Sequence, residues 1–175
     1  MLKIITSLFF LFFTCLSAEI VEKLEVRGND RISKETIRVY GEISVGKNYS
    51  AIDVDKALKN LYETNFFEDI QITLTNGILA IVVKEYPIIN SINLDGEKSK
   101  TITKKVLEKL NLKAKESFIE NKLTQDINLI KKIYASIGFN FVNVDAKIER
   151  FNNNRINLVY FLDKGEKTYI NKINF

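Results

Sequence analysis

The chain has 175 residues, of which 46% are hydrophobic and 27% charged, and its formal net charge is +4. This composition is typical of folded globular protein rather than of disordered segments. The sequence has no histidine and its only cysteine is Cys15, which excludes histidine ligands, histidine acid–base catalysis and a cysteine nucleophile from residues 19–175. Basic residues alternate with acidic ones, as in Lys34-Glu35, which disfavours a nucleic-acid-binding surface.

The first 18 residues have the pattern of a secretory signal peptide. Lys3 precedes a predominantly apolar run at 4–16, and the small residues Ser17 and Ala18 follow it. The run is shorter than the roughly 20 residues that a transmembrane helix needs. We predict cleavage between Ala18 and Glu19.

A lipoprotein signal is the alternative for the N-terminus. In that case Cys15 would be modified and would become the first residue, but Phe12-Phe13-Thr14 lacks the small residues that usually precede such a site. Cleavage after Ala18 leaves a chain without cysteine. The exported part must then be stabilised by its hydrophobic core rather than by disulfides.

The sequence repeats itself. Three segments that begin at Val21, Ile89 and Ile170 share a pattern of alternating apolar residues, and a second motif repeats from Leu61 to Ile133, an offset of 72 residues. Two anchors in the same order indicate tandem copies of one small domain. We predict a signal peptide at 1–18, domains at 19–87 and 88–166, and a loosely held first strand of a third domain at 167–175.

The first copy begins with a strand and two helices. Leu24 and Val26 alternate with charged residues, which is typical of a half-buried strand. Ser33 can cap a short helix, and Ser50 with Asp53 resembles a capping box for a second, amphipathic helix.

A hairpin completes the first copy. Alternating apolar residues at 70–74 and a continuous apolar run at 78–83 flank Asn76-Gly77, which is a type I′ turn signal. The predicted order is therefore βααββ.

The second copy has the same order. A helix after Thr101 precedes a longer helix, whose start at 117–120 has the form of a full capping box and which Gly138 can close. Alternation over 142–148 and a continuous apolar run over 156–162 predict the second hairpin.

These patterns predict an α+β fold with one three-stranded mixed sheet in each copy. A strand that is apolar on both faces belongs between neighbours, so the third strand takes the central position and the strand order is 1-3-2. The two helices bring the chain back to the end of the sheet where the first strand began, so the first and third strands run parallel. The helices cover one face of the sheet. The second strand is left as an open edge.

An open edge can accept an incoming strand by β-augmentation, which tolerates many sequences. Alternatively, the charges of Glu68, Asp69, Asp145 and Lys147 protect the edge from pairing, and both interpretations stay open for each copy. The candidate client-binding residues are Asp69, Ile70, Gln71, Ile72, Thr73, Leu74 and Thr75 in the first copy, and Val142, Asn143, Val144, Asp145, Ala146, Lys147 and Ile148 in the second. Structural roles are predicted for Gly28, Gly46, Asn76, Gly77, Pro87, Gly96 and Gly138.

Other motifs favour structural interpretations. The carboxylate pairs Glu68-Asp69 and Asp53/Asp55 have no companion base, phosphate loop or ligand set, so we predict no catalytic residue, metal, cofactor or enzymatic activity. We assign the aromatic segment 62–69 to core packing at the junction of helix and strand.

Both copies resemble POTRA domains, the polypeptide-transport-associated modules of outer-membrane assembly factors. The resemblance covers nearly all of residues 19–175. The residues that carry it are Val26 to Ile32, Leu61-Tyr62 through Phe67-Glu68-Asp69, Val83 to Ile88 with Pro87, Ile92, Gly96, Tyr134, Gly138, Asn154 to Leu158, and Gly165.

The resemblance implies that the whole protein has five such domains and a C-terminal β-barrel in the outer membrane, and that it folds and inserts other barrel proteins. It implies export to the periplasmic face of that membrane. The implied partners are unfolded outer-membrane protein clients, accessory lipoproteins and periplasmic chaperones, and no nucleic acid. A related outer-membrane secretion or translocation transporter is the alternative; division proteins with one such domain behind a transmembrane anchor fit the two copies less well.

Overall fold

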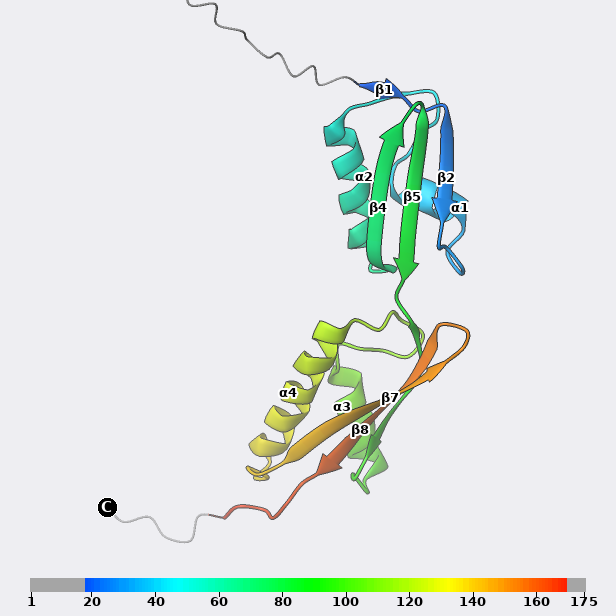
Figure 1. Cartoon of the computed structure of the whole chain (residues 1–175). Coiled ribbons are helices and arrows are strands. Elements are labelled where there is room, and N and C mark those ends of the chain that lie inside the picture. The colour runs from blue at the N-terminus through cyan, green and yellow to red at the C-terminus, as the bar shows by residue number, and fades with distance from the viewer. Residues whose placement is uncertain (1–17, 170–175) are drawn as a thin grey trace, which may run out of the picture. The chain divides into compact units, whose positions relative to one another are not determined.

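A computed structural model describes residues 18–169, which form two βααββ units (Figure 1). Unit 1 contains the chain up to Thr64 together with Asp69–Val83, and unit 2 contains Asn65–Glu68 together with the chain from Lys84 onward. The boundaries 19–87 and 88–166 remain a prediction. Residues 1–17 of the signal peptide predicted at 1–18, and residues 170–175 of the predicted third-domain strand, lie outside the described residues.

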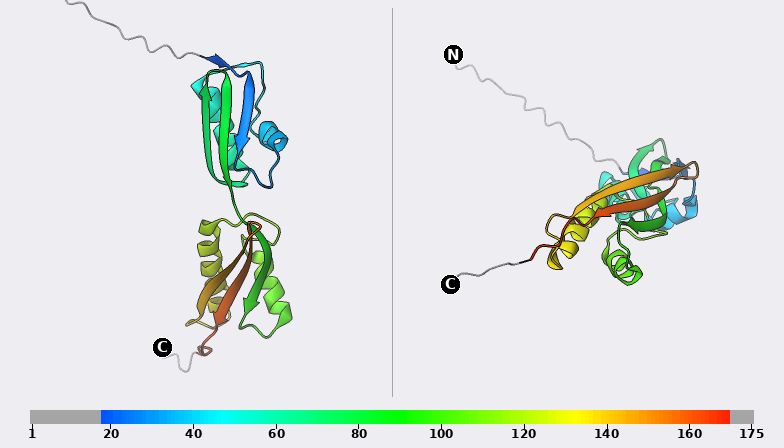
Figure 2. Two further views of the ribbon diagram at one scale, coloured as in Figure 1. Left: turned by 45° about the vertical axis from the view of Figure 1, so that its right-hand side comes forward. Right: turned by 90° about the horizontal axis from the view of Figure 1, so that it is seen from below.

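Unit 1 has the predicted sheet, in the order β2-β5-β4, with β2 parallel to β5. Both helices lie on one face of this sheet (Figure 2). A small additional sheet, in which Glu19 pairs with Tyr49, was not predicted. The elements are β1 (Glu19–Ile20), β2 (Lys23–Arg27), α1 (Lys34–Tyr40), β3 (Asn48–Tyr49), α2 (Ala51–Glu63), β4 (Phe67–Thr75) and β5 (Ile78–Glu85).

Local signals determine where the elements of unit 1 begin. The Ser50 side chain accepts a hydrogen bond from the Asp53 backbone N–H while the Asp53 carboxylate accepts one from the Ser50 N–H, which confirms the predicted capping box. Asn76 and Gly77 have φ of 52° and 75°, as the predicted type I′ turn requires.

Unit 2 repeats the arrangement in the order β6-β8-β7, with β6 parallel and β7 antiparallel to β8. Its two helices again lie on one face of the sheet (Figure 2). The predicted α+β class and 1-3-2 order are therefore confirmed. The elements are β6 (Ile88–Asp95), α3 (Lys100–Lys109), α4 (Glu120–Ser136), β7 (Asn143–Phe151) and β8 (Arg155–Asp163).

The predicted capping box at Ser117 is wrong. Helix α4 begins at Glu120, and its N-cap residue Ile119 makes no side-chain cap bond. Ser117 instead forms a β-bridge with Ile88, and the buried Phe118 donates its N–H to the Pro87 carbonyl at 2.8 Å. Burial of Phe118 holds this segment extended, so the helix starts two residues later than the motif suggests.

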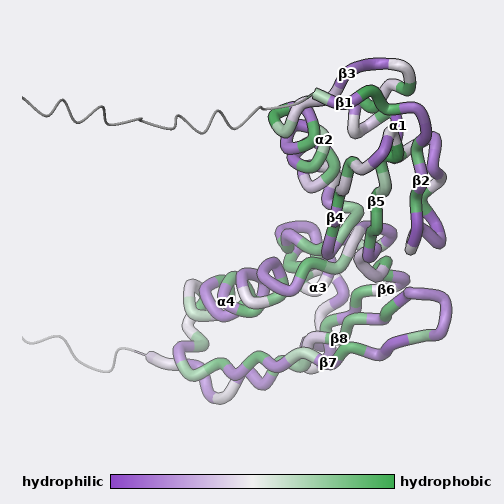
Figure 3. Tube along the Cα trace, turned by 45° about the horizontal axis from the view of Figure 1, so that its top comes forward, coloured by the Kyte–Doolittle hydropathy of each residue, from purple (hydrophilic) through white to green (hydrophobic). Residues whose placement is uncertain are grey.

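The central strands are apolar along most of their length (Figure 3), but only one face of each is buried. In β5, Leu79 and Ile81 are buried under the helices, while Val82 on the other face is 46% exposed. In β8, Tyr160 is buried and Phe161 is 44% exposed. The predicted central position is correct, but the reason given for it, burial on both faces, is wrong.

The first and last strands approach closely at one glycine in each unit. A Cβ atom on Gly28 would lie 2.1 Å from the Val83 carbonyl oxygen, and one on Gly96 would lie 1.9 Å from that of Leu162. Both glycines have positive φ, 78° and 93°. Only glycine fits at this repeated position, because a side chain would overlap the carbonyl of the last strand where the parallel pairing ends.

Glu97, next to Gly96, connects three parts of unit 2. It accepts hydrogen bonds from the Tyr134 hydroxyl at 2.8 Å and the Ser99 N–H at 2.9 Å, and Lys164 lies 3.3 Å away. Burial raises the pKa of Glu97, but these donors together lower it by more, so its net pKa is below the usual 4.5. Burial and the Glu97 carboxylate raise the pKa of Tyr134.

The segment after β8 is attached to unit 2 as far as Thr168, whose N–H donates to the Gly138 carbonyl at 2.8 Å. Lys164 also lies over the Phe139 ring, 5.6 Å from its centroid. The chain is therefore anchored at Thr168, and looser attachment of the other residues after Gly165 stays a prediction.

A buried acid stabilises the connection between α3 and α4. Asp126 is fully buried and accepts hydrogen bonds from the backbone N–H groups of Asn111 and Leu112, at 2.7 and 2.9 Å, and from the Tyr160 hydroxyl at 3.2 Å. These donors satisfy both oxygens of the buried side chain, which a polar group in the core requires.

Gly28→Ala should destabilise unit 1 by about 3–5 kcal/mol, because the new methyl group would overlap the Val83 carbonyl in a left-handed backbone conformation. Gly46→Ala is the matched control: its φ is 88°, yet nothing lies within 4 Å of the added Cβ. It should cost about 1–2 kcal/mol. Urea unfolding followed through unit 1 amide signals measures both, and equal costs would contradict the close approach.

Glu97→Gln should remove a pH-dependent part of the stability of unit 2. Because the folded state lowers the pKa of Glu97, the stabilisation is present above the unfolded value of 4.5 and is lost as pH falls through the folded pKa. The wild-type advantage over Glu97→Gln in urea unfolding should therefore be largest above pH 4.5 and shrink below it. An advantage independent of pH would show that the carboxylate charge does not contribute.

Candidate strand-binding edges

Each three-stranded sheet has two edges, because the order places the first and second strands of each unit on the outside. The predicted open edge is the second strand, β4 or β7. The first strands, β2 and β6, are edges too. The two kinds of edge differ in whether backbone of the same unit covers them.

Backbone from the segment before the second helix covers the start of the first strand. In unit 1 the Val21 N–H donates to the Lys47 carbonyl at 3.0 Å, and the Gly46 N–H donates to the Val21 carbonyl at 2.7 Å. The Lys34 ammonium group donates to the Leu24 carbonyl at 2.6 Å further along the strand. The Lys34 contact occupies a position at which an incoming strand would pair with β2, and the Val21 contacts lie just before that strand.

Unit 2 covers its first strand in the same way. The Ile89 N–H donates to the Glu116 carbonyl at 2.9 Å, and the Lys115 N–H donates to the Ile89 carbonyl at 2.7 Å. Ile89 corresponds to Val21 in the repeat, so the two units share this contact. The repeat of Val21 at Ile89 was visible in the sequence. The hydrogen bonds that cover the first strand at these two residues were not predicted.

The outer edge of β4 is flanked by α2 and pairs with no other strand among residues 18–169 (Figure 1). The side chain of Ile70 is buried, and those of Ile72 and Leu74 are half-buried on the helix side. In a hairpin with a two-residue loop, the residues that flank the loop, here Thr75 and Ile78, hydrogen bond to each other. The direction of the backbone N–H groups alternates along a strand, so the N–H of Thr73 points toward β5 and those of Ile72 and Leu74 point outward. The remaining candidate residues of this strand, Asp69, Gln71, Thr73 and Thr75, have exposed side chains.

The outer edge of β7 runs from Asn143 to Phe151, the same length as β4, and also lacks a strand partner in the described part of the chain. Val144 is buried and Ala146 and Ile148 are half-buried, as the predicted alternation requires. Val142 lies just before the strand, so its assignment to β7 is wrong by one residue. The remaining candidates, Asn143, Asp145 and Lys147, have exposed side chains.

The charges on these strands are paired within their own sheets. Lys84 on β5 lies 2.9 Å from Glu68, and Lys147 lies 3.3 Å from Glu149 two residues along β7. Strand side chains stand roughly perpendicular to the sheet. The ion pairs therefore lie over the open faces and leave the backbone edges accessible.

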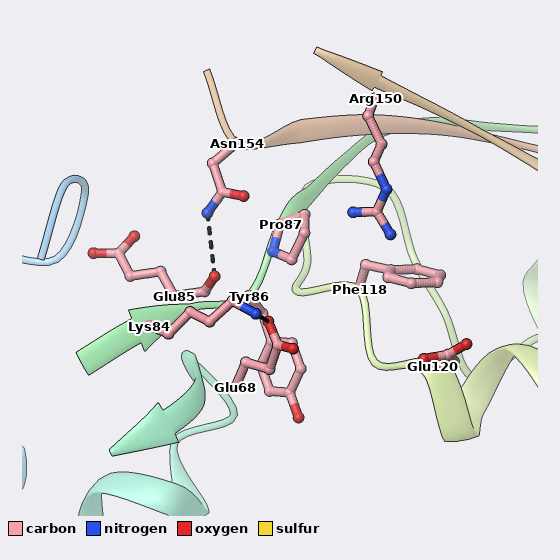
Figure 4. Close-up of a pocket in the computed structure, with 9 residues that line it drawn as sticks. All are labelled: Glu68, Lys84, Glu85, Tyr86, Pro87, Phe118, Glu120, Arg150 and Asn154. Atoms are coloured by element: carbon pink, nitrogen blue, oxygen red, sulfur yellow. Dashed lines mark hydrogen bonds and ion pairs between the residues drawn. The ribbon is translucent and has the colours of Figure 1, made fainter. Parts of the chain in front are cut away.

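A pocket of about 360 Å³ lies at the start of unit 2, around Pro87 (Figure 4). Asn154 donates to the Glu85 carbonyl at 3.2 Å, and the Tyr86 N–H donates to the Phe66 carbonyl at 2.9 Å. Both bonds hold residues just before Pro87, and the structural role of Pro87 itself stays a prediction. The pocket is lined by Glu68, Lys84, Glu85, Tyr86, Pro87, Phe118, Glu120, Arg150 and Asn154.

Within residues 18–169 there is no group of three or more acidic side chains arranged to hold a metal ion. The helices of the same range are also too short or too polar to span a bilayer.

The family model POTRA, described as "Surface antigen variable number repeat", matches residues 87–165, which is most of unit 2. The BamA outer membrane protein assembly factor of Neisseria meningitidis is 28% identical over 157 residues, covering 89% of this chain and 20% of that protein. BamA of Neorickettsia risticii is 23% identical over 169 residues, covering 96% of this chain and 22% of that protein. The chain thus spans about a fifth of the length of these relatives.

Among solved structures, the N-terminal domain of Omp85 from Thermosynechococcus elongatus has a TM-score of 0.52 to this chain at 16% identity. The similarity covers 82% of this chain and 63% of the Omp85 chain, and it supports the fold. Residues 87–165 thus match the POTRA family, and nearly the whole chain is similar to part of the outer membrane protein assembly factor BamA.

Proposed function

We propose that the two units bind extended segments of unfolded outer-membrane proteins by strand addition to β4 and β7. The observation that carries this proposal is the difference between the edges of each sheet. The start of the first strand is covered by the unit's own backbone at Val21 or Ile89, whereas the second strand pairs with nothing on its outer side among residues 18–169.

Strand addition suits a receptor that must accept many sequences. Main-chain N–H and C=O groups supply the hydrogen bonds, and these are the same in every client. The half-buried residues Ile72 and Leu74, and Ala146 and Ile148 in unit 2, offer apolar contact to every second side chain of the added strand. Client strands of outer-membrane barrels alternate apolar and polar residues with the same period.

The relatives suggest the cellular setting of this activity. We infer that the units work without catalysis at the periplasmic face of the outer membrane, as part of a longer protein that assembles β-barrels there. Accessory lipoproteins and periplasmic chaperones would dock on the remaining surfaces. A secretion transporter would carry the same units, but no contact within residues 18–169 favours that alternative.

An NMR titration tests the proposal directly. The exported chain, beginning at Glu19, is titrated with a peptide from a strand of an outer-membrane barrel, and a proline-interrupted peptide of the same composition serves as the control. Amide shifts should concentrate at 69–75 and 142–148 with the first peptide only. Shifts elsewhere, or none at millimolar peptide, would contradict strand addition.

Proline substitutions separate the edge from the fold. Ile72→Pro removes an outward N–H and should cost about 1–2 kcal/mol in urea unfolding, with loss of the β4 shifts. Thr73→Pro removes an N–H that faces β5, so it should cost about 3 kcal/mol although its side chain is exposed. In β7, Ala146→Pro is preferable to Val144→Pro, because Val144 belongs to the core. Equal costs at Ile72 and Thr73, or retained β4 shifts in Ile72→Pro, would refute the assigned orientation.

A further inference from the structure

The edge of β4 carries a side-chain cap. Near the end of α2, the Tyr62 hydroxyl accepts a hydrogen bond from the Ile70 backbone N–H at 3.1 Å and donates to Asp69 Oδ1 at 3.5 Å. Ile70 has the same parity along β4 as Ile72 and Leu74, so its N–H group also points to the outer edge, and Tyr62 occupies it.

The corresponding tyrosine of unit 2 is used differently. Tyr134, at the offset of 72 residues from Tyr62, is completely buried and donates its hydroxyl to Glu97 at 2.8 Å. Tyr62 is 41% exposed. Among residues 18–169, no side chain hydrogen bonds to a backbone N–H of β7. Tyr62 and Tyr134 are equivalent in the repeat, but only Tyr62 occupies an N–H group at the edge of its sheet. The edges of β4 and β7 therefore differ in how many N–H groups are accessible.

We propose that Tyr62 closes the start of the β4 edge and thereby makes β7 the preferred site for an incoming strand. In unit 1 a client strand reaches only the N–H groups of Ile72 and Leu74 unless it displaces the Tyr62 hydroxyl. In unit 2 a strand can pair along all of Asn143–Phe151. This inference rests on the proposed strand addition and adds to it a ranking of the two edges and the residue that sets it.

Asp69 helps to hold the cap in place. Its Oδ1 atom accepts from the Tyr62 hydroxyl, while the Gln71 side-chain amide donates to its Oδ2 atom at 3.3 Å. With its proton directed to Asp69, the hydroxyl presents a lone pair to the Ile70 N–H. In a client that adds to this part of β4, a carbonyl oxygen must replace the Tyr62 hydroxyl as the acceptor of the Ile70 N–H. One hydrogen bond replaces another, so the net gain in free energy is small.

The test compares Tyr62→Phe with the wild type in the exported chain, using a barrel-strand peptide and separate dissociation constants from the β4 and β7 amides. Wild type should bind more tightly at β7. Tyr62→Phe should tighten binding at β4 by roughly twofold to tenfold, from the usual net strength of one hydrogen bond, and should add Ile70 to the shifted amides. Binding at β7 should not change.

Asp69→Ala is the second variant, because it keeps the tyrosine but removes the acceptor that orients its hydroxyl. It should tighten β4 binding by less than Tyr62→Phe does. Tyr169→Phe, which removes an exposed hydroxyl from unit 2, should change neither site.

The outcomes separate this inference from the proposed function. If Tyr62→Phe leaves β4 binding unchanged or weaker while β7 binding is intact, the proposed role of Tyr62 is overturned and strand addition still stands. If Tyr62→Phe lowers the stability of unit 1 without tightening β4 binding, Tyr62 only tethers α2 to β4. Tighter binding at β4 than at β7 in the wild type would overturn the ranking. Loss of binding at both strands in every variant would overturn the proposed function itself.

Discussion

In each unit the first strand hydrogen bonds in parallel to the last strand, and the remaining features of the unit depend on this pairing. Parallel neighbours need a crossover connection, and here two helices provide it and cover one face of the sheet. The hairpin then places the second strand on the other side of the central strand. Gly28 and Gly96 permit the close approach of the first strand to Val83 and Leu162 at the end of the pairing.

This topology produces two edges, and the crossover covers one of them. The chain that returns from the first helix to the second passes the start of the first strand and pairs with Val21 or Ile89. The second strand lies on the far side, where no connection passes. An uncovered edge is therefore a consequence of the fold, and the Tyr62 hydroxyl occupies one of its N–H groups.

Features set by local chemistry were predictable from the sequence. Ser50 and Asp53 form a capping box because both partners lie within one helical turn. Ser117 carries the same motif but is held in a β-bridge with Ile88, because burial of its neighbour outweighs a cap. The different roles of Tyr62 and Tyr134 were not predictable, since they depend on which side chain, Asp69 or Glu97, tertiary packing brings to the hydroxyl.

Amide hydrogen exchange of residues 19–175 without a client peptide tests most directly whether the second-strand edges are unoccupied. Along β4, exchange should be slow at Gln71 and Thr73, which face β5, and at Ile70, which Tyr62 caps. Ile72 and Leu74 should exchange much faster, because their N–H groups face solvent. Slow exchange at Ile72 and Leu74 would mean that the edge is already paired in the free chain, and would contradict its role as a receptor for incoming strands.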